Sequence, residues 1–239
     1  MSVLGKTLVA LIAVAGPAWA DAGRAWRVET ERGPIHVWVP AGYDPETAAT
    51  VVFVHGYHTD VDTAWATLRL PHQVSKSGVN AMFIAAAAPS SKRDAIVWPS
   101  VNALVATVAI DLGVRMPTGR LVAIGHSGAY RTLATWLDSP TLDTVVLLDA
   151  AYGEDGFARW VRAEADRRLI TIAADTVRDS DRMHRALPET ALVEGLPAAL
   201  PDARIIHART TVGHAQLVTD GVALPLALRA LGIPRVTSR

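Results

Sequence analysis

Serine, histidine and aspartate residues in the second half of the chain have the types that acyl transfer requires. Ser127 lies in the run GHSGA at positions 125–129, between small residues. A serine hydroxyl is a weak nucleophile until a neighbouring base takes its proton, and that base needs a carboxylate to fix its tautomer. His214, in the loop after the last predicted strand, is the candidate base. The pattern therefore indicates nucleophilic catalysis by Ser127.

The carboxylate that would orient His214 has more than one candidate. Asp175 follows the apolar stretch LITIA at 169–173, and Asp149 follows VVLL at 145–148, one predicted strand earlier. Asp179 lies deeper in the same loop as Asp175 and suits a solvated charge or a helix cap. The residues leave the choice between Asp175 and Asp149 open, and the aspartate that is not the acid would be a structural cap.

Buried strands alternate with helices along most of the chain and would position these side chains. Short apolar runs, typical of strands buried on both faces, lie at 50–54, 81–86, 121–124, 144–148, 169–173 and 204–208. Apolar residues at helical spacing lie at 97–114, 129–137, 157–165 and 216–231. An edge hairpin is predicted at 26–39. This alternation predicts an α/β fold, a doubly wound, mainly parallel sheet with helices on both faces.

The candidate catalytic residues all fall where such a sheet binds its ligands, at the carboxyl ends of the strands. Each of them directly follows a predicted strand: His55, Ser127, Asp149, Asp175 and His214. Because parallel strands end at the same edge, we expect these side chains to converge there.

The turn around Ser127 joins a predicted strand to a predicted helix, and it resembles the nucleophile elbow of the α/β-hydrolase superfamily, G-x-S-x-G. Gly125 and Ser127 match that pattern, and Ala129 replaces the last glycine with another small residue. The order of serine, acid and histidine along the chain also matches the superfamily, and the resemblance spans roughly residues 51–215. It implies a minimal α/β-hydrolase with little or no cap domain, because the loops after the strands are short.

The resemblance also implies roles for individual residues. It favours Asp175 as the acid, at the superfamily's usual position, with Asp149 as the alternative that some lipases use. The two amides that hold the oxyanion would be those of Tyr57 and Gly128. His58 and Tyr130 would line the substrate pocket, whereas His126 and His55 would be packed or loop-shaping residues.

The segment from His55 to Asp62 contains residue types that bind metals, which raises the alternative of a metallohydrolase. Its histidines and aspartates match neither H-E-x-x-H nor a zinc ribbon. Acyl transfer by a serine needs no metal and no organic cofactor, and none is expected.

Composition bounds the class of protein. The chain has 239 residues, a formal net charge of zero and no basic run, which argues against a nucleic-acid surface. After Lys6, an apolar run at 8–15 and Ala18-Trp19-Ala20 have the layout of a signal peptide, residues 1–20, that is too short for a stable membrane anchor. With no cysteine, disulfides and a cysteine-linked lipid are excluded. We expect a single domain at 21–239, exported to the periplasm or the medium.

These observations predict a secreted or periplasmic serine hydrolase that cleaves an ester, or a related acyl bond, through an acyl-enzyme on Ser127. Its substrate would be a small molecule or an accessible acyl group on a polymer. Two alternatives stay open: a non-catalytic binding protein on the same fold, and an amidase or peptidase that uses the same residues. The sequence does not indicate an oligomeric state.

Overall fold

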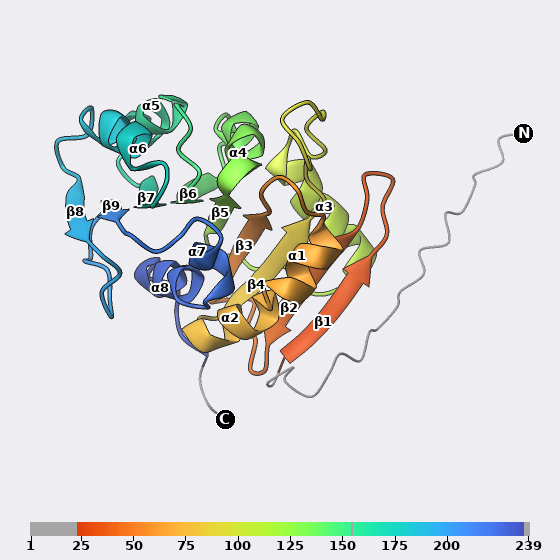
Figure 1. The fold of residues 1–239 in the computed structure, drawn as a ribbon. Helices are drawn as coiled ribbons and strands as arrows, with labels where there is room; N and C mark the ends of the chain where they lie inside the picture. The colour runs from red at the N-terminus through yellow and green to blue at the C-terminus, as the bar shows by residue number, and fades with distance from the viewer. Residues whose placement is uncertain (1–22, 154, 237–239) are drawn as a thin grey trace, which may run out of the picture.

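The computed structural model describes residues 23–153 and 155–236, which form one nine-stranded sheet with helices on both faces (Figure 1). The order across the sheet is β1-β2-β4-β3-β5-β6-β7-β9-β8. The strands are β1 (Gly23–Val28), β2 (Ile35–Pro40), β3 (Ala49–Val54), β4 (Ala81–Ala86), β5 (Leu121–His126), β6 (Leu142–Leu148), β7 (Arg168–Ala173), β8 (Ala191–Glu194) and β9 (Ile205–Arg209).

The sheet is antiparallel only at one edge, where β2 pairs with β1 and with β4. From β4 to β8 every neighbouring pair is parallel. Parallel strands need crossovers, and the helices that provide them cover both faces, so the central strands are buried on both sides and have no polar alternation. The predicted doubly wound, mainly parallel sheet is confirmed.

Two apolar layers hold the helices on the sheet. On one face pack α1 (Val61–Thr67), α2 (Leu70–Ser77), α7 (Gln216–Thr219) and α8 (Ala223–Ala230). On the other face pack α3 (Val101–Leu112), α4 (Tyr130–Trp136), α5 (Gly156–Ala163) and α6 (Val177–His184). The second layer includes the buried Trp136, whose indole N–H donates to the carbonyl of Trp98 at 2.7 Å.

The C-terminal region departs from the expected single helix at 216–231. The structure has two helices, α7 and α8, with Gly221 between them at a φ of +66°. Glycine adopts this left-handed conformation easily, and the conformation ends a helix. The apolar spacing predicted one helix because it continues on both sides of this break.

The connection after β6 is short, and it bears on access to the site. The chain passes from β6 to α5 through residues 149–155 alone. Across residues 23–153 and 155–236 no cap domain is present, as predicted. None of the helices described is long and apolar enough to cross a membrane. The predicted signal peptide lies outside the described residues.

Candidate active site

Ser127 lies on a sharp turn between β5 and α4, and the short 3-10 helix Ser127–Ala129 opens there. Its φ is +54°, a left-handed value that costs a non-glycine residue roughly 1–3 kcal/mol and survives only where the surroundings enforce it. A Cβ built on Gly125 would lie 2.9 Å from the Leu133 side chain and 3.0 Å from the Cβ of Ala129. The small residues on both sides of the serine are therefore a packing requirement of this turn.

The loop after β3 packs directly against the turn. A Cβ built on Gly56 would lie 2.8 Å from the Cβ of Ser127, and one built on Gly128 would lie 2.5 Å from the ring of Tyr57. The first amides of a helix have no intrahelical acceptor, which leaves the amide of Gly128 for a ligand. The amide of His58 donates to the carbonyl of Ser90 at 2.8 Å, so it is already engaged. The close contacts of Gly56 and Gly128 thus place Tyr57 and Gly128 next to each other, beside Ser127.

His214 is hydrogen-bonded to a buried carboxylate. Its Nδ1 lies 2.5 Å from Oδ2 of Asp149, whose side chain is fully buried at the end of β6. An ionised carboxylate only accepts, so Nδ1 carries the proton and Nε2 of the neutral ring is the free base. This hydrogen bond, the larger effect, and the charge of Asp149 raise the pKa of His214 above its ordinary value, against the effect of burial.

Several donors stabilise the negative charge of Asp149. Its Oδ1 accepts from the amides of Ala174 and Thr176 at 2.9 and 2.8 Å and from the Thr176 hydroxyl at 2.6 Å. Its Oδ2 accepts from the amide of Asp175 at 3.1 Å as well as from His214. Burial alone would raise the pKa of Asp149, but these hydrogen bonds outweigh it and hold the pKa well below its usual range. The carboxylate is ionised at any physiological pH.

The partner of His214 differs from the one that the superfamily's usual position favours. The alternative residue, Asp149, makes the hydrogen bond, whereas Asp175 supplies its backbone amide to that same carboxylate. Asp149 has a φ of +49°, a turn at the end of β6 that directs its side chain under the loop of residues 174–176. A carboxylate oxygen of Asp175 lies within 4.8 Å of both His214 and Asp149, so Asp175 adds negative charge near the histidine without bonding to it.

His126 packs against the ring of His214 and is hydrogen-bonded to its backbone. The two rings lie 4.6 Å apart at an angle of 34°, and Nε2 of His126 lies 3.1 Å from the backbone carbonyl of His214. That carbonyl only accepts, so Nε2 of His126 carries a proton. Burial, followed by the charge of His214, lowers the pKa of His126 to about 4. A neutral, hydrogen-bonded ring at this place holds the His214 loop, which agrees with a packed rather than a reactive residue.

Two aromatic side chains frame the serine. Tyr152, 38% exposed, lies 5.4 Å from Tyr130, ring centre to ring centre. Burial raises the pKa of Tyr152, and a hydrogen-bond contact with the side chain of Ser127 opposes this rise. The resemblance implies Tyr130 as a residue of the substrate pocket. Tyr152 was not predicted, and the only signal for it was its position three residues after Asp149.

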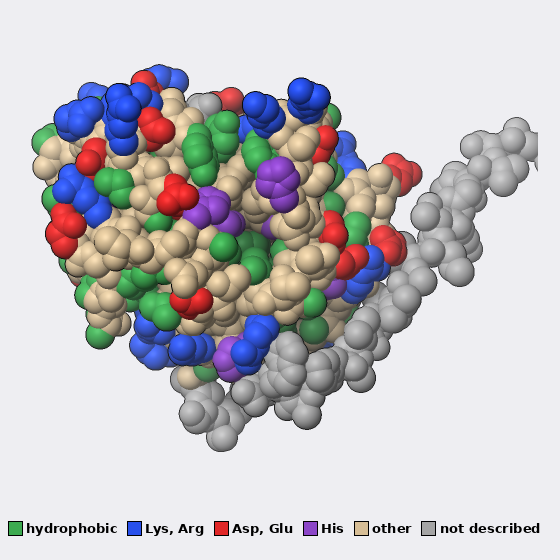
Figure 2. Space-filling view, viewed as in Figure 1, with side chains coloured by type: hydrophobic (Ala, Val, Ile, Leu, Met, Phe, Trp, Pro, Cys, Tyr) green, Lys and Arg blue, Asp and Glu red, His purple; other side chains and the backbone are tan. Residues whose placement is uncertain are grey.

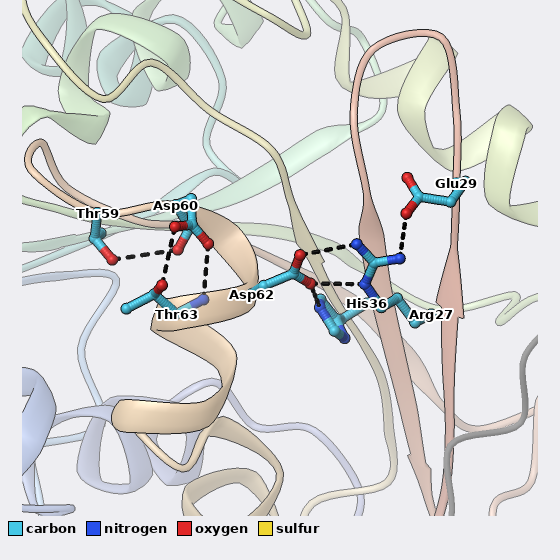
Figure 3. Close-up of polar contacts among 7 residues, drawn as sticks. All are labelled: Arg27, Glu29, His36, Thr59, Asp60, Asp62 and Thr63. Atoms are coloured by element: carbon cyan, nitrogen blue, oxygen red, sulfur yellow. Dashed lines mark hydrogen bonds and ion pairs between the residues drawn. The ribbon is translucent and has the colours of Figure 1, made fainter.

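The two aspartates of the segment 55–62 have partners other than a metal. Asp60 caps α1 by accepting from the amide and hydroxyl of Thr63 at 2.8 and 2.9 Å (Figure 3). Asp62 points to the opposite side, where it accepts two hydrogen bonds from Arg27 at 2.8 Å and one contact from His36 at 2.5 Å (Figure 3). Within the described ranges, one group of potential ligands comes together, Asp149, Asp175 and His214. Five protein donors already bond to the oxygens of Asp149, which suits a fixed anion better than a metal ligand.

No protein-family model and no curated protein sequence matches this chain. Solved structures do match. The feruloyl esterase module of Clostridium thermocellum has a TM-score of 0.59 at 12% identity, over 94% of this chain and 95% of its own. A fluorophosphonate-binding serine hydrolase of Staphylococcus aureus has 0.56 at 11% identity, over 87% and 98%. S-formylglutathione hydrolase from Agrobacterium tumefaciens has 0.53 at 12% identity, over 91% and 98%.

Proposed function

We propose, from the α/β-hydrolase fold of this chain, that it is a serine hydrolase that cleaves an ester through an acyl-enzyme on Ser127. The observation that carries the proposal is the hydrogen bond of 2.5 Å between His214 and Asp149, at the edge of the sheet where the turn of Ser127 also lies. A buried carboxylate that fixes the tautomer of a histidine is what a serine base requires. The esterase and serine hydrolase activities of the structural neighbours support an ester as the substrate.

Each residue has a role in the proposed reaction. His214 takes the hydroxyl proton of Ser127 at Nε2 while the oxygen attacks the ester carbonyl, and the amides of Tyr57 and Gly128 hold the resulting oxyanion. When the tetrahedral species collapses, the bond from carbon to the alcohol oxygen breaks and His214 returns the proton to the alcohol. Water, activated by the same histidine, then releases the acid from Ser127. Asp149 stays ionised and orients the imidazole throughout.

The open site supports small esters or acyl groups on an accessible polymer, because no cap limits the approach to Ser127 within the residues described. Amides would be cleaved by the same residues, and the geometry gives no reason to prefer them. The signal-peptide layout of residues 1–20 supports export of the protein to the periplasm or the medium.

The first test is labelling of the purified protein with a fluorophosphonate, which reacts with activated serines. We expect the protein to be labelled and Ser127→Ala to remain unlabelled while keeping its circular dichroism spectrum. If the folded protein takes no label, the chain is a binding protein on this fold, and ester hydrolysis is excluded as its function.

A pair of matched variants then separates the two aspartates. Asp149→Asn is expected to lower kcat by a factor on the order of 10³–10⁴, because the amide favours the wrong tautomer of His214. Asp175→Asn keeps the backbone amide that Asp149 needs and should change kcat by only about threefold. The opposite ranking in two folded variants would reassign the acid to Asp175.

A further inference from the structure

A pocket of about 450 Å³ adjoins the proposed oxyanion loop and was not assigned above. Its lining residues are Tyr57, His58, Ser91, Lys92 and Arg93. The ring of Tyr57 is shared between two environments, because it also packs on the Cα of Gly128, next to the nucleophile. The ring of Tyr57 therefore separates the pocket from the residue next to Ser127. A substrate bound at Ser127 could extend its non-reacting part into this pocket.

The loop of residues 90–94 forms the wall of the pocket opposite Tyr57, and hydrogen bonds from α4 fix its position. The guanidinium of Arg131, on α4, donates to the carbonyls of Lys92 at 2.8 Å and Asp94 at 3.2 Å. The same group reaches the hydroxyl of Tyr57 at 3.4 Å, which links this wall to the opposite one. The helix after the nucleophile thus fixes the loop of residues 90–94, and the pocket exists before a substrate binds.

The carboxylate of this loop, Asp94, is ionised and offsets part of the positive charge, but it forms no ion pair with Lys92 or Arg93 among the residues described. Asp94 accepts from the hydroxyls and amides of Ser90 and Ser91, at distances from 2.8 to 3.0 Å. The side chains of Lys92 and Arg93 are exposed, and among the residues described neither forms an ion pair or a side-chain hydrogen bond. Within the described chain, the residues that line this pocket include Lys92 and Arg93 and no carboxylate, and the surface that they offer to it is mainly apolar. In Figure 2, Lys and Arg side chains lie in two separate groups along the top of the face, and a hollow bordered by histidines lies below and between them.

We propose that Lys92 and Arg93 give the enzyme a preference for esters that carry an anionic group, such as a carboxylate, a few atoms from the scissile bond. The pocket provides an aromatic wall for the connecting carbons and two cations for the charge at its rim. An unpaired cation near the surface attracts an opposite charge over a few ångströms, and two cations add to this attraction. The proposal rests on the proposed function, because it names the substrate class of that same site.

The test compares esters of matched size with and without a charge, in two arms. In the first arm the charge lies on the acyl part, with p-nitrophenyl hexanoate set against p-nitrophenyl hydrogen adipate. In the second arm it lies on the alcohol part, with 3-methylphenyl acetate set against 3-acetoxybenzoate. We expect the anionic ester of at least one arm to be preferred by about fivefold to twentyfold in kcat/KM, mainly through KM. The preference should shrink in 0.5 M salt, where the Debye length falls to roughly 4 Å.

Two double variants identify the source of the preference. Lys92→Gln/Arg93→Gln should bring the ratio of anionic to neutral ester to about one. The matched control, Lys76→Gln/Arg229→Gln, removes the same types of charge from exposed positions on α2 and α8 and should keep the ratio.

The outcomes separate this inference from the function on which it rests. Equal kcat/KM for both esters in both arms, in a protein that takes the fluorophosphonate label, would overturn the anionic preference and leave the hydrolase intact. A preference that survives the loop variant would overturn it too, whatever the control variant does. Absence of the label would reject the hydrolase itself.

Discussion

At the scale of single residues, the site depends on the protonation states of three side chains, those of Asp149, His214 and His126. Asp149 receives only hydrogen bonds, His214 donates from one nitrogen, and His126 is held neutral behind it. Because the burial of His126 lowers its pKa to about 4, it adds no positive charge next to His214 at neutral pH. The raised pKa of His214 is thus set by Asp149 first, and the pH dependence of turnover reports this pair.

Turnover should fall on the acid side with the titration of His214. The base acts only when deprotonated, so kcat/KM rises with pH through the pKa of His214, which lies above the ordinary 6.5. In Asp149→Asn the partner no longer favours the charged ring, and the midpoint of the residual activity should shift to lower pH. The measurement is a profile of kcat/KM from pH 5 to 9 for both proteins. Coincident midpoints would show that Asp149 does not set this pKa.

Gly56→Ala should inactivate the protein through a steric effect. The added methyl would lie 2.8 Å from the Cβ of Ser127, so either the serine turn or the loop of Tyr57 must move. A displacement of this size at reacting atoms costs about 10²-fold in kcat. Gly195→Ala is the control: it adds the same methyl where nothing lies within 4 Å, although its φ of +78°, unlike that of Gly56, is unsuited to alanine. If Gly56→Ala keeps wild-type turnover, the close contact with Ser127 is not part of the active geometry.

At the scale of elements, the apolar runs were enough to predict the central strands, because a strand buried on both faces leaves a continuous signal. They could not predict β8, an edge strand of four residues whose side chains are all partly or fully exposed. Nor could they predict α6, whose sequence VRDSDRMH buries Ser180 and His184 along with Met183. Burial of polar side chains depends on partners from distant segments, and no local pattern records those partners.

The same limit applies to the candidate site. The turn of Ser127 and the position of His214 follow from strand order, which the sequence patterns predict. The hydrogen-bond partner of His214 depends instead on the φ of +49° at Asp149 and on the loop of residues 174–176 above it. Tyr152 approaches Ser127 only because the connection after β6 is short.

A further prediction concerns the attachment of α1 to the edge hairpin. Asp62 on α1 accepts two hydrogen bonds from Arg27 on β1, and His36 on β2 contacts the same carboxylate (Figure 3). The ring of His36 also stacks on Trp65 at 4.6 Å. Asp62→Ala should lower the free energy of unfolding by about 1 kcal/mol, a bidentate pair discounted for its partial exposure. Urea unfolding measures this. Glu29→Gln, at the exposed end of the same guanidinium, is the control and should change it by less than about 0.5 kcal/mol; equal effects would refute the special role of Asp62.

At the scale of the whole molecule, buried neutral histidines make stability depend on acid. His184 and His207 stack face to face, 4.5 Å apart at 6°, between α6 and the sheet. Burial, and then the charge of His207, lower the pKa of His184 to about 3. Between that value and 6.5 the unfolded chain binds a proton that the folded protein refuses. This contribution is therefore complete above pH 6.5 and is lost progressively as the pH falls towards 3.

Unfolding free energies in urea should decrease from pH 7 to pH 4.5. Each histidine held neutral contributes a slope of up to about 1.4 kcal/mol per pH unit over its window. His184→Gln keeps polar contacts to Thr171 and Thr190 within reach and should flatten the slope, even if it lowers stability at pH 7. An unchanged slope in this variant would assign the acid sensitivity to other groups.

The positive φ of Ser127 has a consequence for how this chain can evolve. A backbone conformation that suits glycine is occupied by serine, the proposed nucleophile, so the fold is less stable there than it could be. Ser127→Gly would relieve the strain and abolish the nucleophile in one step. In a lineage that no longer needs the reaction, such a replacement would be tolerated at this position. It would give an inactive but more stable protein. Under the proposed function, the reaction alone would favour serine over glycine on this turn.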